Sequence, residues 1–265
     1  MRLSRHRALL IVAAIALPLL PVATTGAALP VCRSLDARWH PDMRAAIAYA
    51  HGRQGDISFA VRTEHRFYGY RARTVVPSAS VVKAMLMVAY LDMPSVSRRR
   101  LNGGDYALLV PMIRRSDNNA ATAVRDIVGN GRLIALARRV GMSQFATNPV
   151  WGLTQVTAAD QTKFFLHIDR FVTPHHRPFA LGLLSTITPS QRWGVGRVKP
   201  RGWQLYVKGG WGSGSGAVDH QVALLTRGCN RLSLAIMTLA DGTHAYGKET
   251  LRAIAQRLLR GLPTA

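Results

Sequence analysis

The chain has 265 residues, of which 48% are hydrophobic and 18% are charged. That composition is typical of a globular domain, and it excludes a disordered chain, a collagen-like chain and a polytopic membrane protein. The formal net charge is +22, but only five of the 35 basic residues are lysines and the arginines are scattered along the chain. Nucleic-acid-binding proteins instead gather basic residues on one face among aromatic side chains, so we expect no nucleic-acid partner.

The first residues have the pattern of a secretion signal. Three arginines within the first seven residues precede an apolar run from Ala8 to Ala23, and small residues follow at 24–28. The run is shorter than the roughly 20 residues that a membrane-spanning helix needs, and Pro18 and Pro21 interrupt it. We therefore predict a signal peptide over residues 1–28 and an exported protein, secreted or associated with the cell envelope, without stable membrane insertion. An uncleaved anchor is the alternative.

The two cysteines lie far apart in the sequence. Cys32 follows the predicted signal peptide, and Cys229 lies in a Gly-Cys-Asn turn between two strand-like runs. In an oxidising compartment, such a pair favours a disulfide. Lipidation of Cys32 competes with this interpretation, but it requires small residues immediately before the cysteine, and Leu29, Pro30 and Val31 fit that requirement poorly.

The first predicted elements are a helix and a hairpin. Apolar residues at helical spacing predict a helix over Pro41–His51. Two strand-like runs follow, Ile57–Arg62 and Phe67–Arg71, joined by a short polar turn. The long apolar run Ser80–Leu91 then predicts a buried helix.

The middle of the chain is predicted to be mostly helical, and its last part to form strands. Thr157 is a suitable N-cap for the helix that follows it, and the last helix is amphipathic. The predicted helices are Ala120–Ile127, Leu133–Val140, Ala158–Ile168 and Glu249–Leu259, and the predicted strands are Gln204–Lys208, His220–Thr226 and Leu232–Leu239.

The simplest assembly of these elements is an α/β fold of the α+β type. It has an antiparallel sheet of about five strands flanked by the terminal helices, with an all-helical subdomain, about residues 72–200, inserted between strands 2 and 3. We predict a single domain over residues 29–265 and a monomer.

A first candidate catalytic pair lies at the start of the buried helix, in Ser80-Val81-Val82-Lys83. Residues three apart lie on one helix face, so the Lys83 amine can reach the Ser80 hydroxyl and, if burial lowers its pKa, take its proton. The alternative is a serine at a helix N-terminus beside a solvated lysine. Lys83 lies inside an apolar run, however, where a lysine without a partner is costly.

Two further motifs follow in order along the chain. Ser116-Asp117-Asn118, at a helix entry, offers a hydroxyl for proton transfer and an amide for a substrate carbonyl, although a plain helix cap would explain the same residues. Lys208-Gly209-Gly210 follows a strand, where a cation among glycines can bind a carboxylate while the bare backbone approaches the ligand. A Gly-rich hairpin is the alternative for this motif.

Together, these motifs resemble the S-x-x-K, S-D-N and K-T-G elements of the penicillin-recognising serine enzymes. The resemblance is greatest to class A β-lactamases and spans about Trp39 to Leu262, including the order of the elements. It implies that the backbone N–H groups of Ser80 and Trp211 form the oxyanion hole, beside Gly210. It also implies roles for the motif side chains: Ser80 as the acylated nucleophile, Lys83 as its base or proton relay, Ser116 as the proton donor to the leaving nitrogen, Asn118 as the ligand of the substrate amide, and Lys208 as the partner of its carboxylate.

The chain departs from this family where the acyl-enzyme is hydrolysed. Class A β-lactamases use a Glu that positions a water, on a long loop between the second and third motifs. The two glutamates of this chain, Glu64 and Glu249, lie outside that interval, and the stretch 141–157 is short. Asp160 and Asp169 fall on a predicted helix, and Gly209 replaces the usual hydroxyl residue, which removes one donor to the carboxylate.

The sequence therefore predicts a class A β-lactamase-like serine hydrolase whose Ser80 attacks a β-lactam or a related cell-wall amide and whose deacylation is slow. The expected substrate partner is a β-lactam or a peptidoglycan stem peptide. A D-Ala-D-Ala carboxypeptidase of the penicillin-binding type and a catalytically silent envelope-binding module are the alternatives. No metal and no cofactor are expected, because His175-His176 has no accompanying ligand pair and the Gly-rich run before Asp219 lacks nucleotide-binding spacing.

Overall fold

A computed structural model describes residues 34–212 and 217–264. The chain divides into two compact units, Met1–Val31 and Cys32–Ala265, and the described residues all belong to the second. The predicted signal peptide therefore lies outside the described residues and stays a prediction. Within the two described ranges, no helix combines the length and the apolar character that crossing a membrane requires.

The second unit is built on a five-stranded antiparallel sheet with the strand order β2-β1-β7-β6-β5. β1 pairs with its hairpin neighbour β2 and with the distant β7. β5 lies at the edge of this sheet and pairs with β6, so that Lys208 lies opposite Val222 and Trp211 opposite Asp219. The strands are β1 (Asp56–Thr63), β2 (Phe67–Tyr70), β5 (Gln204–Gly212), β6 (Val218–Arg227) and β7 (Asn230–Leu239), and a separate short ribbon pairs β3 (Val76–Pro77) with β4 (Gln155–Val156).

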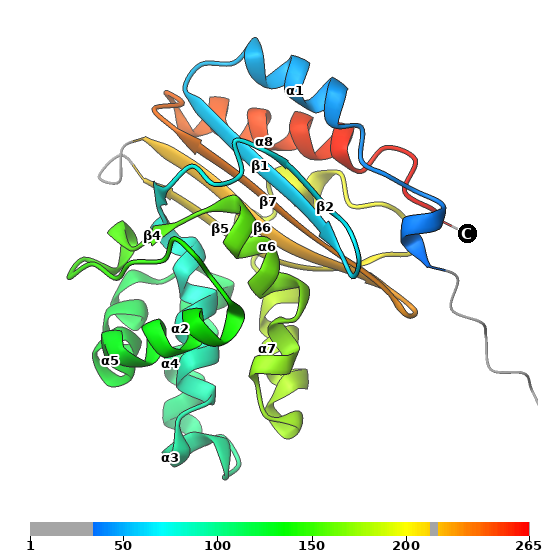
Figure 1. The fold of residues 1–265 in the computed structure, drawn as a ribbon. Helices are drawn as coiled ribbons and strands as arrows, with labels where there is room; N and C mark the ends of the chain where they lie inside the picture. The colour runs from blue at the N-terminus through cyan, green and yellow to red at the C-terminus, as the bar shows by residue number, and fades with distance from the viewer. Residues whose placement is uncertain (1–33, 213–216, 265) are drawn as a thin grey trace, which may run out of the picture. The chain divides into compact units, whose positions relative to one another are not determined.

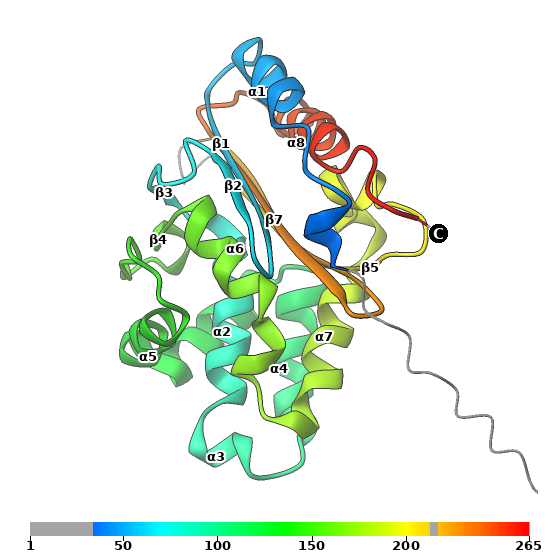
Figure 2. The same cartoon turned by 45° about the vertical axis from the view of Figure 1, so that its right-hand side comes forward.

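Helices cover both faces of the sheet. α1 and α8 lie side by side on one face (Figure 1), where they pack on Phe59 and Ile236. The other helices lie on the opposite face (Figure 2), where Ala60 and Met237 contribute to the core. The α-helices are α1 (Met43–His51), α2 (Val82–Leu91), α3 (Pro94–Ser97), α4 (Gly103–Arg114), α5 (Asn118–Val140), α6 (Ala158–Leu166), α7 (Arg177–Ser185) and α8 (His244–Leu258).

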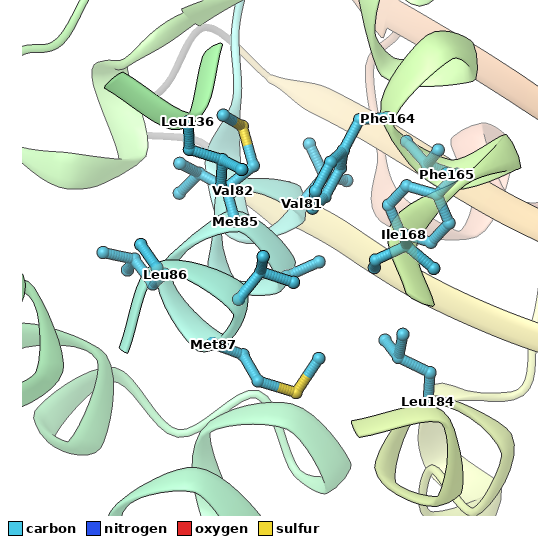
Figure 3. Packing of buried hydrophobic residues seen from close by; sticks show 14 of the residues in the cluster. Val81, Val82, Met85, Leu86, Met87, Leu136, Phe164, Phe165, Ile168 and Leu184 are labelled. Carbon is cyan, nitrogen blue, oxygen red and sulfur yellow. The ribbon is translucent and has the colours of Figure 1, made fainter. Parts of the chain in front are cut away.

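The helix that follows Ser80 is the centre of the helical layer. All residues of α2, from Val82 to Leu91, are buried, as expected for a helix that is apolar on all sides. Met85 and Leu86 pack among side chains of α5 and α6, including Phe164 (Figure 3). Lys83 is therefore carried into the interior by a helix that has no solvent-facing side.

Several predicted boundaries differ from the observed ones. The helix predicted from Ser80 starts as an α-helix at Val82, because the preceding residues form a 3-10 turn. The last helix begins at His244 rather than Glu249, with Thr243 as its N-cap. The strand predicted to end at Lys208 continues to Gly212. The 3-10 helices are η1 (Leu35–Ala37), η2 (Ala79–Val81), η3 (Trp151–Leu153), η4 (Ile168–Phe171), η5 (Pro174–His176), η6 (Pro189–Gln191) and η7 (Gly194–Arg197).

The middle of the chain contains more helix than predicted. The two helices predicted over Ala120–Ile127 and Leu133–Val140 are parts of α5, which is kinked at Gly129 (φ 71°, ψ 159°). α3, α4 and α7 were not predicted. α4 starts with a capping box, in which the Asn102 side chain accepts from the Asp105 N–H and the Asp105 side chain accepts from the Asn102 N–H.

Cys229 lies in the turn between β6 and β7, beside the pair of Arg227 with Asn230. Its predicted disulfide partner, Cys32, lies outside the described residues. The disulfide therefore stays a prediction.

Candidate active site

Ser80 lies in the 3-10 turn η2, immediately before α2, and is 7% exposed. The preceding residue, Ala79, has a φ of 43°, in the left-handed region that a non-glycine residue rarely adopts. The Ser78 N–H donates to the Thr154 carbonyl (2.7 Å), and the β3–β4 ribbon pairs the adjacent segments. The end of the short 141–157 stretch therefore holds the Ser80 turn in place.

His220, on β6, fixes the segment before Ser80 from the other side. Its Nδ1 accepts from the Thr238 N–H (3.2 Å), so its Nε2 is the atom that donates to the Pro77 carbonyl (2.8 Å). Burial lowers the pKa of His220 to about 4, so the ring is neutral at physiological pH. No local sequence signal marks this residue, because its role depends on a contact between distant segments.

Gly210 brings the edge strand against the Ser80 turn. A Cβ atom on Gly210 would lie 2.6 Å from the Ser80 nitrogen and 2.9 Å from the Val81 nitrogen. No real Cβ atom fits at such distances, so only glycine allows this approach. The Ser80 nitrogen therefore lies against Gly210, the residue that precedes Trp211 in the chain.

Lys83 is completely buried at the bottom of this site. Its Nζ donates to the Ser116 carbonyl (2.6 Å), to Asn118 Oδ1 (2.8 Å) and to Ser116 Oγ (3.3 Å). Between described residues, no hydrogen bond joins Lys83 to Ser80. Burial lowers the pKa of Lys83 to about 7, against the opposing effect of the Asp117 charge. Near neutral pH, a large fraction of Lys83 is therefore an uncharged amine, which donates to two of these three acceptors and has one lone pair.

Ser116 connects the two buried lysines. Lys208 Nζ donates to Ser116 Oγ (3.0 Å) and to the Gly209 carbonyl (2.7 Å). Burial, and then the charge of Lys83, holds the pKa of Lys208 well below its usual value. Because a hydroxyl oxygen has two lone pairs, two lysine donors leave Ser116 with only its own proton to offer. Its φ of 61° places it in the left-handed region, which orients its carbonyl toward Lys83.

The second motif caps a helix and also contacts Lys83. The Asp117 side chain accepts from the Ala120 N–H (2.9 Å) and caps α5, as the plain-cap interpretation predicts. Ser116 and Asn118 are instead turned toward Lys83. Since the Asn118 oxygen is used by Lys83, its NH₂ group remains for a ligand acceptor.

The short 141–157 stretch places an aromatic side chain beside the lysine. The Trp151 ring lies 4.7 Å from Lys83 Nζ, and its Nε1 donates to Thr122 (3.1 Å). No local sequence signal places Trp151 in the site. Through Trp151, the 141–157 stretch contributes an aromatic ring to the lining of the site.

Two carboxylates between the second and third motifs, Asp160 and Asp169, are bound to structural partners. Asp160 accepts from the N–H groups of Ser143 and Gln144 (3.1 and 3.0 Å). Asp169 pairs with Arg231 (2.5 Å). Asp160 lies on α6 as predicted, but Asp169 lies on the 3-10 turn η4, because the observed helix α6 ends at Leu166.

Trp193 explains the glycine in the third motif. A Cβ atom on Gly209 would lie 2.7 Å from Cζ2 of Trp193. The buried Trp193 ring therefore fills the space that a hydroxyl side chain at 209 would need. Trp193 also contacts the Trp211 ring edge to face, with 6.4 Å between the ring centroids.

One residue of the His175-His176 pair makes a structural contact. His176 is buried and its Nε2 lies 3.2 Å from the Val96 carbonyl. Within the part of the chain that the structure describes, no group of three or more His, Cys, Asp or Glu side chains is arranged to hold a metal ion.

A protein-family model described as "Beta-lactamase enzyme family" matches residues 106–262, which is more than half of the chain. The chain belongs to the beta-lactamase enzyme family. Membership implies a serine hydrolase in general terms. The matched interval contains Ser116, Asn118 and Lys208 but begins after Ser80 and Lys83, so these two residues are placed in the site by the geometry above.

Solved structures from this family share the fold. A beta-lactamase from Sphaerobacter thermophilus DSM 20745 is 19% identical and covers 83% of this chain and 97% of its own, with a TM-score of 0.72. A beta lactamase from Xanthomonas campestris pv. campestris str. ATCC 33913 is 15% identical and covers 86% and 98%, with a TM-score of 0.73. No curated protein sequence matches the chain.

The protein PBP-A is a further structural neighbour. It is 15% identical and covers 82% of this chain and 93% of its own, with a TM-score of 0.67. At these identities, the neighbours establish the fold. The predicted fold class and the predicted membership of the penicillin-recognising serine enzyme superfamily are confirmed.

Proposed function

We propose that this protein is an exported serine hydrolase in which Ser80 opens a β-lactam or a related cell-wall amide, forms a covalent acyl-enzyme and releases it slowly. The observation that supports this most strongly is the buried cluster beside the Ser80 turn in which Lys83 and Lys208 both donate a hydrogen bond to Ser116. Burying two lysines that contact the same serine costs free energy. This cost favours a catalytic role for the two lysines over a purely structural one.

The proposed acylation uses the side chains of this cluster to move protons. The neutral Lys83 amine takes the proton of Ser80, and Ser80 Oγ attacks the carbonyl carbon of the amide. The N–H groups of Ser80 and Trp211 stabilise the negative charge on the tetrahedral intermediate. The C–N bond then breaks as Ser116 gives its proton to the leaving nitrogen, and the Lys83 ammonium, 3.3 Å from Ser116 Oγ, replaces that proton.

The ligand is bound by side-chain groups whose hydrogen-bonding capacity is not used up within the cluster. The Asn118 NH₂ donates to the ligand's side-chain amide. Lys208 attracts its carboxylate, and the arrival of that anion favours the protonated form of Lys208 against the effect of burial.

Slow deacylation is proposed because the described carboxylates near Lys83 are already used by the fold: Asp117, whose charge acts on Lys83, caps α5. Asp160 and Asp169 are used by structural partners, and Trp151 is the residue of the short 141–157 stretch that contacts Lys83. The lack, among the described residues, of a carboxylate available to activate water also favours a second candidate, a D-Ala-D-Ala carboxypeptidase. Such enzymes deacylate without the Glu that class A β-lactamases use.

Intact-mass spectrometry of the mature protein after brief and long incubation with a penicillin tests the proposal. Ser80→Ala is the test variant, and Ser95→Ala, an exposed serine on α3, is the matched control. We expect an adduct that persists for hours in the wild type and in Ser95→Ala, and none in Ser80→Ala.

Three other results would change the proposal. A transient adduct with hydrolysed drug would contradict slow release. Release of D-Ala from a D-Ala-D-Ala peptide would establish the carboxypeptidase. No adduct in the wild type would contradict the proposal and favour a catalytically silent envelope-binding module.

A further inference from the structure

A pocket lies beside Trp211, the residue that follows Gly210 of the candidate active site. Its volume is about 350 Å³, and it is lined by Trp211, by Asp219 of β6, by Asp241 and by His244 at the start of α8. Trp211 belongs to both sites, because its backbone follows Gly210, the residue that packs on the Ser80 nitrogen. We call this volume the acidic pocket.

Two buried carboxyl groups lie in the acidic pocket. Asp219 is 2% exposed and Asp241 is 1% exposed. Asp219 Oδ1 lies 2.5 Å from His244 Nδ1, and Asp241 Oδ2 accepts from the Thr238 hydroxyl (2.5 Å). Asp241 Oδ1 is buried and has no hydrogen-bond partner among the described residues. A buried acceptor of this kind is normally satisfied, so the pocket is suited to a ligand that brings a hydrogen-bond donor.

The surrounding backbone is adapted to these carboxyl groups. Gly247, in the first turns of α8, has no room for a side chain, because a Cβ atom there would overlap both Asp219 and Asp241. Glycine inside a helix is unfavourable relative to alanine. At position 247 it is nevertheless required, because a larger residue would displace the two carboxyl groups beside the helix.

The aromatic rings of Trp211 and His244 also line the acidic pocket. Trp211 stacks on His244, with 5.0 Å between ring centroids and an interplanar angle of 18°. Trp193 meets His244 edge to face at 5.5 Å. Carboxylates beside an aromatic wall attract organic cations through charge and through the ring faces. No metal-binding group of three side chains is found in the described ranges, so a donor-bearing organic cation fits the acidic pocket better than a metal ion.

The pKa values of the two carboxyl groups set the pH range in which the acidic pocket carries negative charge. Burial, and then the neighbouring Asp241, raises the pKa of Asp219 to about 8. Burial also raises the pKa of Asp241, and burial together with Lys248 lowers that of His244. Lys248 is the cation whose charge acts on both Asp219 and His244. A bound cation would therefore stabilise the ionised carboxylates and release a proton.

We propose that the acidic pocket binds a protonated primary amine carried by the ligand of Ser80. The link to Ser80 rests on the proposed function, whereas binding of an amine by the acidic pocket does not. An ammonium group offers three donors, of which Asp241 Oδ1 accepts one, and its alkyl stem lies along the Trp211 ring.

The binding test is an NMR titration with n-butylammonium, followed on the indole N–H signals and assigned to Trp211 with Trp211→Phe. We expect the Trp211 signal to shift at pH 8, with affinity at least tenfold weaker at pH 6, where Asp219 is protonated. Asp241→Asn should reduce the affinity at least tenfold, and the matched control Asp126→Asn, an exposed residue of α5, should not. The neutral analogue n-butanol should not bind.

A variant that leaves the buried groups intact keeps the test decisive. Lys248→Gln removes the nearby cation, so it should tighten n-butylammonium binding by about twofold to fivefold. No binding in the wild type, or equal binding of n-butanol, would overturn the proposal.

The link to Ser80 is tested by acylation with a penicillin in the presence of n-butylammonium. A changed acylation rate in the wild type, abolished by Asp241→Asn, supports the link. Binding of n-butylammonium without any effect on acylation would overturn the link and assign the amine to a separate small ligand. Binding of n-butylammonium to a protein that forms no adduct with any penicillin would contradict the proposed function and the link, while amine binding itself would stand. Acylation without n-butylammonium binding would contradict only the acidic pocket.

Discussion

The pH dependence of Ser80 acylation tests the role of Lys83 directly. With the pKa of Lys83 at about 7 rather than its ordinary 10.5, the neutral amine is about 9% of the population at pH 6, about 50% at pH 7 and about 91% at pH 8. If that amine is the base, the acylation rate should rise about tenfold from pH 6 to pH 8 and then level off. A lysine with an ordinary pKa would instead give a rise of about a hundredfold with no plateau.

Lys83→Arg separates the base from the hydrogen-bond donor. The guanidinium can still donate to Ser116 and Asn118, but it stays protonated at all accessible pH values. We expect the acylation rate to fall by about a hundredfold or more, the usual contribution of a general base. Lys163→Arg, a partly exposed lysine of α6, is the matched control and should keep the wild-type rate.

Stopped-flow measurement with a chromogenic penicillin, between pH 5.5 and 9, gives both the profile and the rates. Mass spectrometry under the same conditions confirms that the signal is the Ser80 adduct. A flat profile, or a Lys83→Arg variant that acylates at the wild-type rate, would refute the assignment of Lys83 as the base.

Three further outcomes are expected. Gly209→Thr should lower the free energy of unfolding by about 1–3 kcal/mol in urea titrations, because the new threonine side chain would overlap the ring of Trp193. If adding Trp193→Leu does not restore part of the loss, the overlap is not the cause. Gly210→Ala should reduce acylation at least tenfold with little change in ligand affinity, because its methyl group would push β5 away from the Ser80 nitrogen; an unchanged rate would contradict this. Asp105→Asn should cost about 1–3 kcal/mol near pH 7. Arg99 holds the pKa of Asp105 well below its usual value, so the wild type should lose this advantage as the pH falls below about 4 and the variant should not; parallel pH curves would argue against it.

The elements that carry the motifs could be predicted because their signals are local. The run around Lys83 is apolar on every side, which favours a buried helix in any fold, and the structure buries it completely. α4 was missed because Gly103, Gly104 and Pro111 are poor helix formers. Its stability comes from a capping box and a buried face instead.

The contacts around the motifs could not be predicted, because they join segments far apart in the chain. His220 is 143 residues from Pro77, and nothing in its strand distinguishes it from an ordinary core residue. The same holds for Trp193 beside Gly209 and for Asp219 beside His244. Lys83 was expected to reach the Ser80 hydroxyl, and its hydrogen bonds instead go to Ser116 and Asn118, a preference that depends on how α5 enters the site.

The two buried lysines divide the protein's positive charge into a fixed part and a variable part. Most of the 35 basic residues are arginines, whose charge does not change with pH. Lys83 and Lys208, by contrast, have lowered pKa values. Ionic strength should therefore act on the long-range attraction of an anionic ligand by the arginines, while pH should act on the contact of the ligand with Lys208 and on the chemical step at Lys83. Salt and pH would thus act on different groups of this protein.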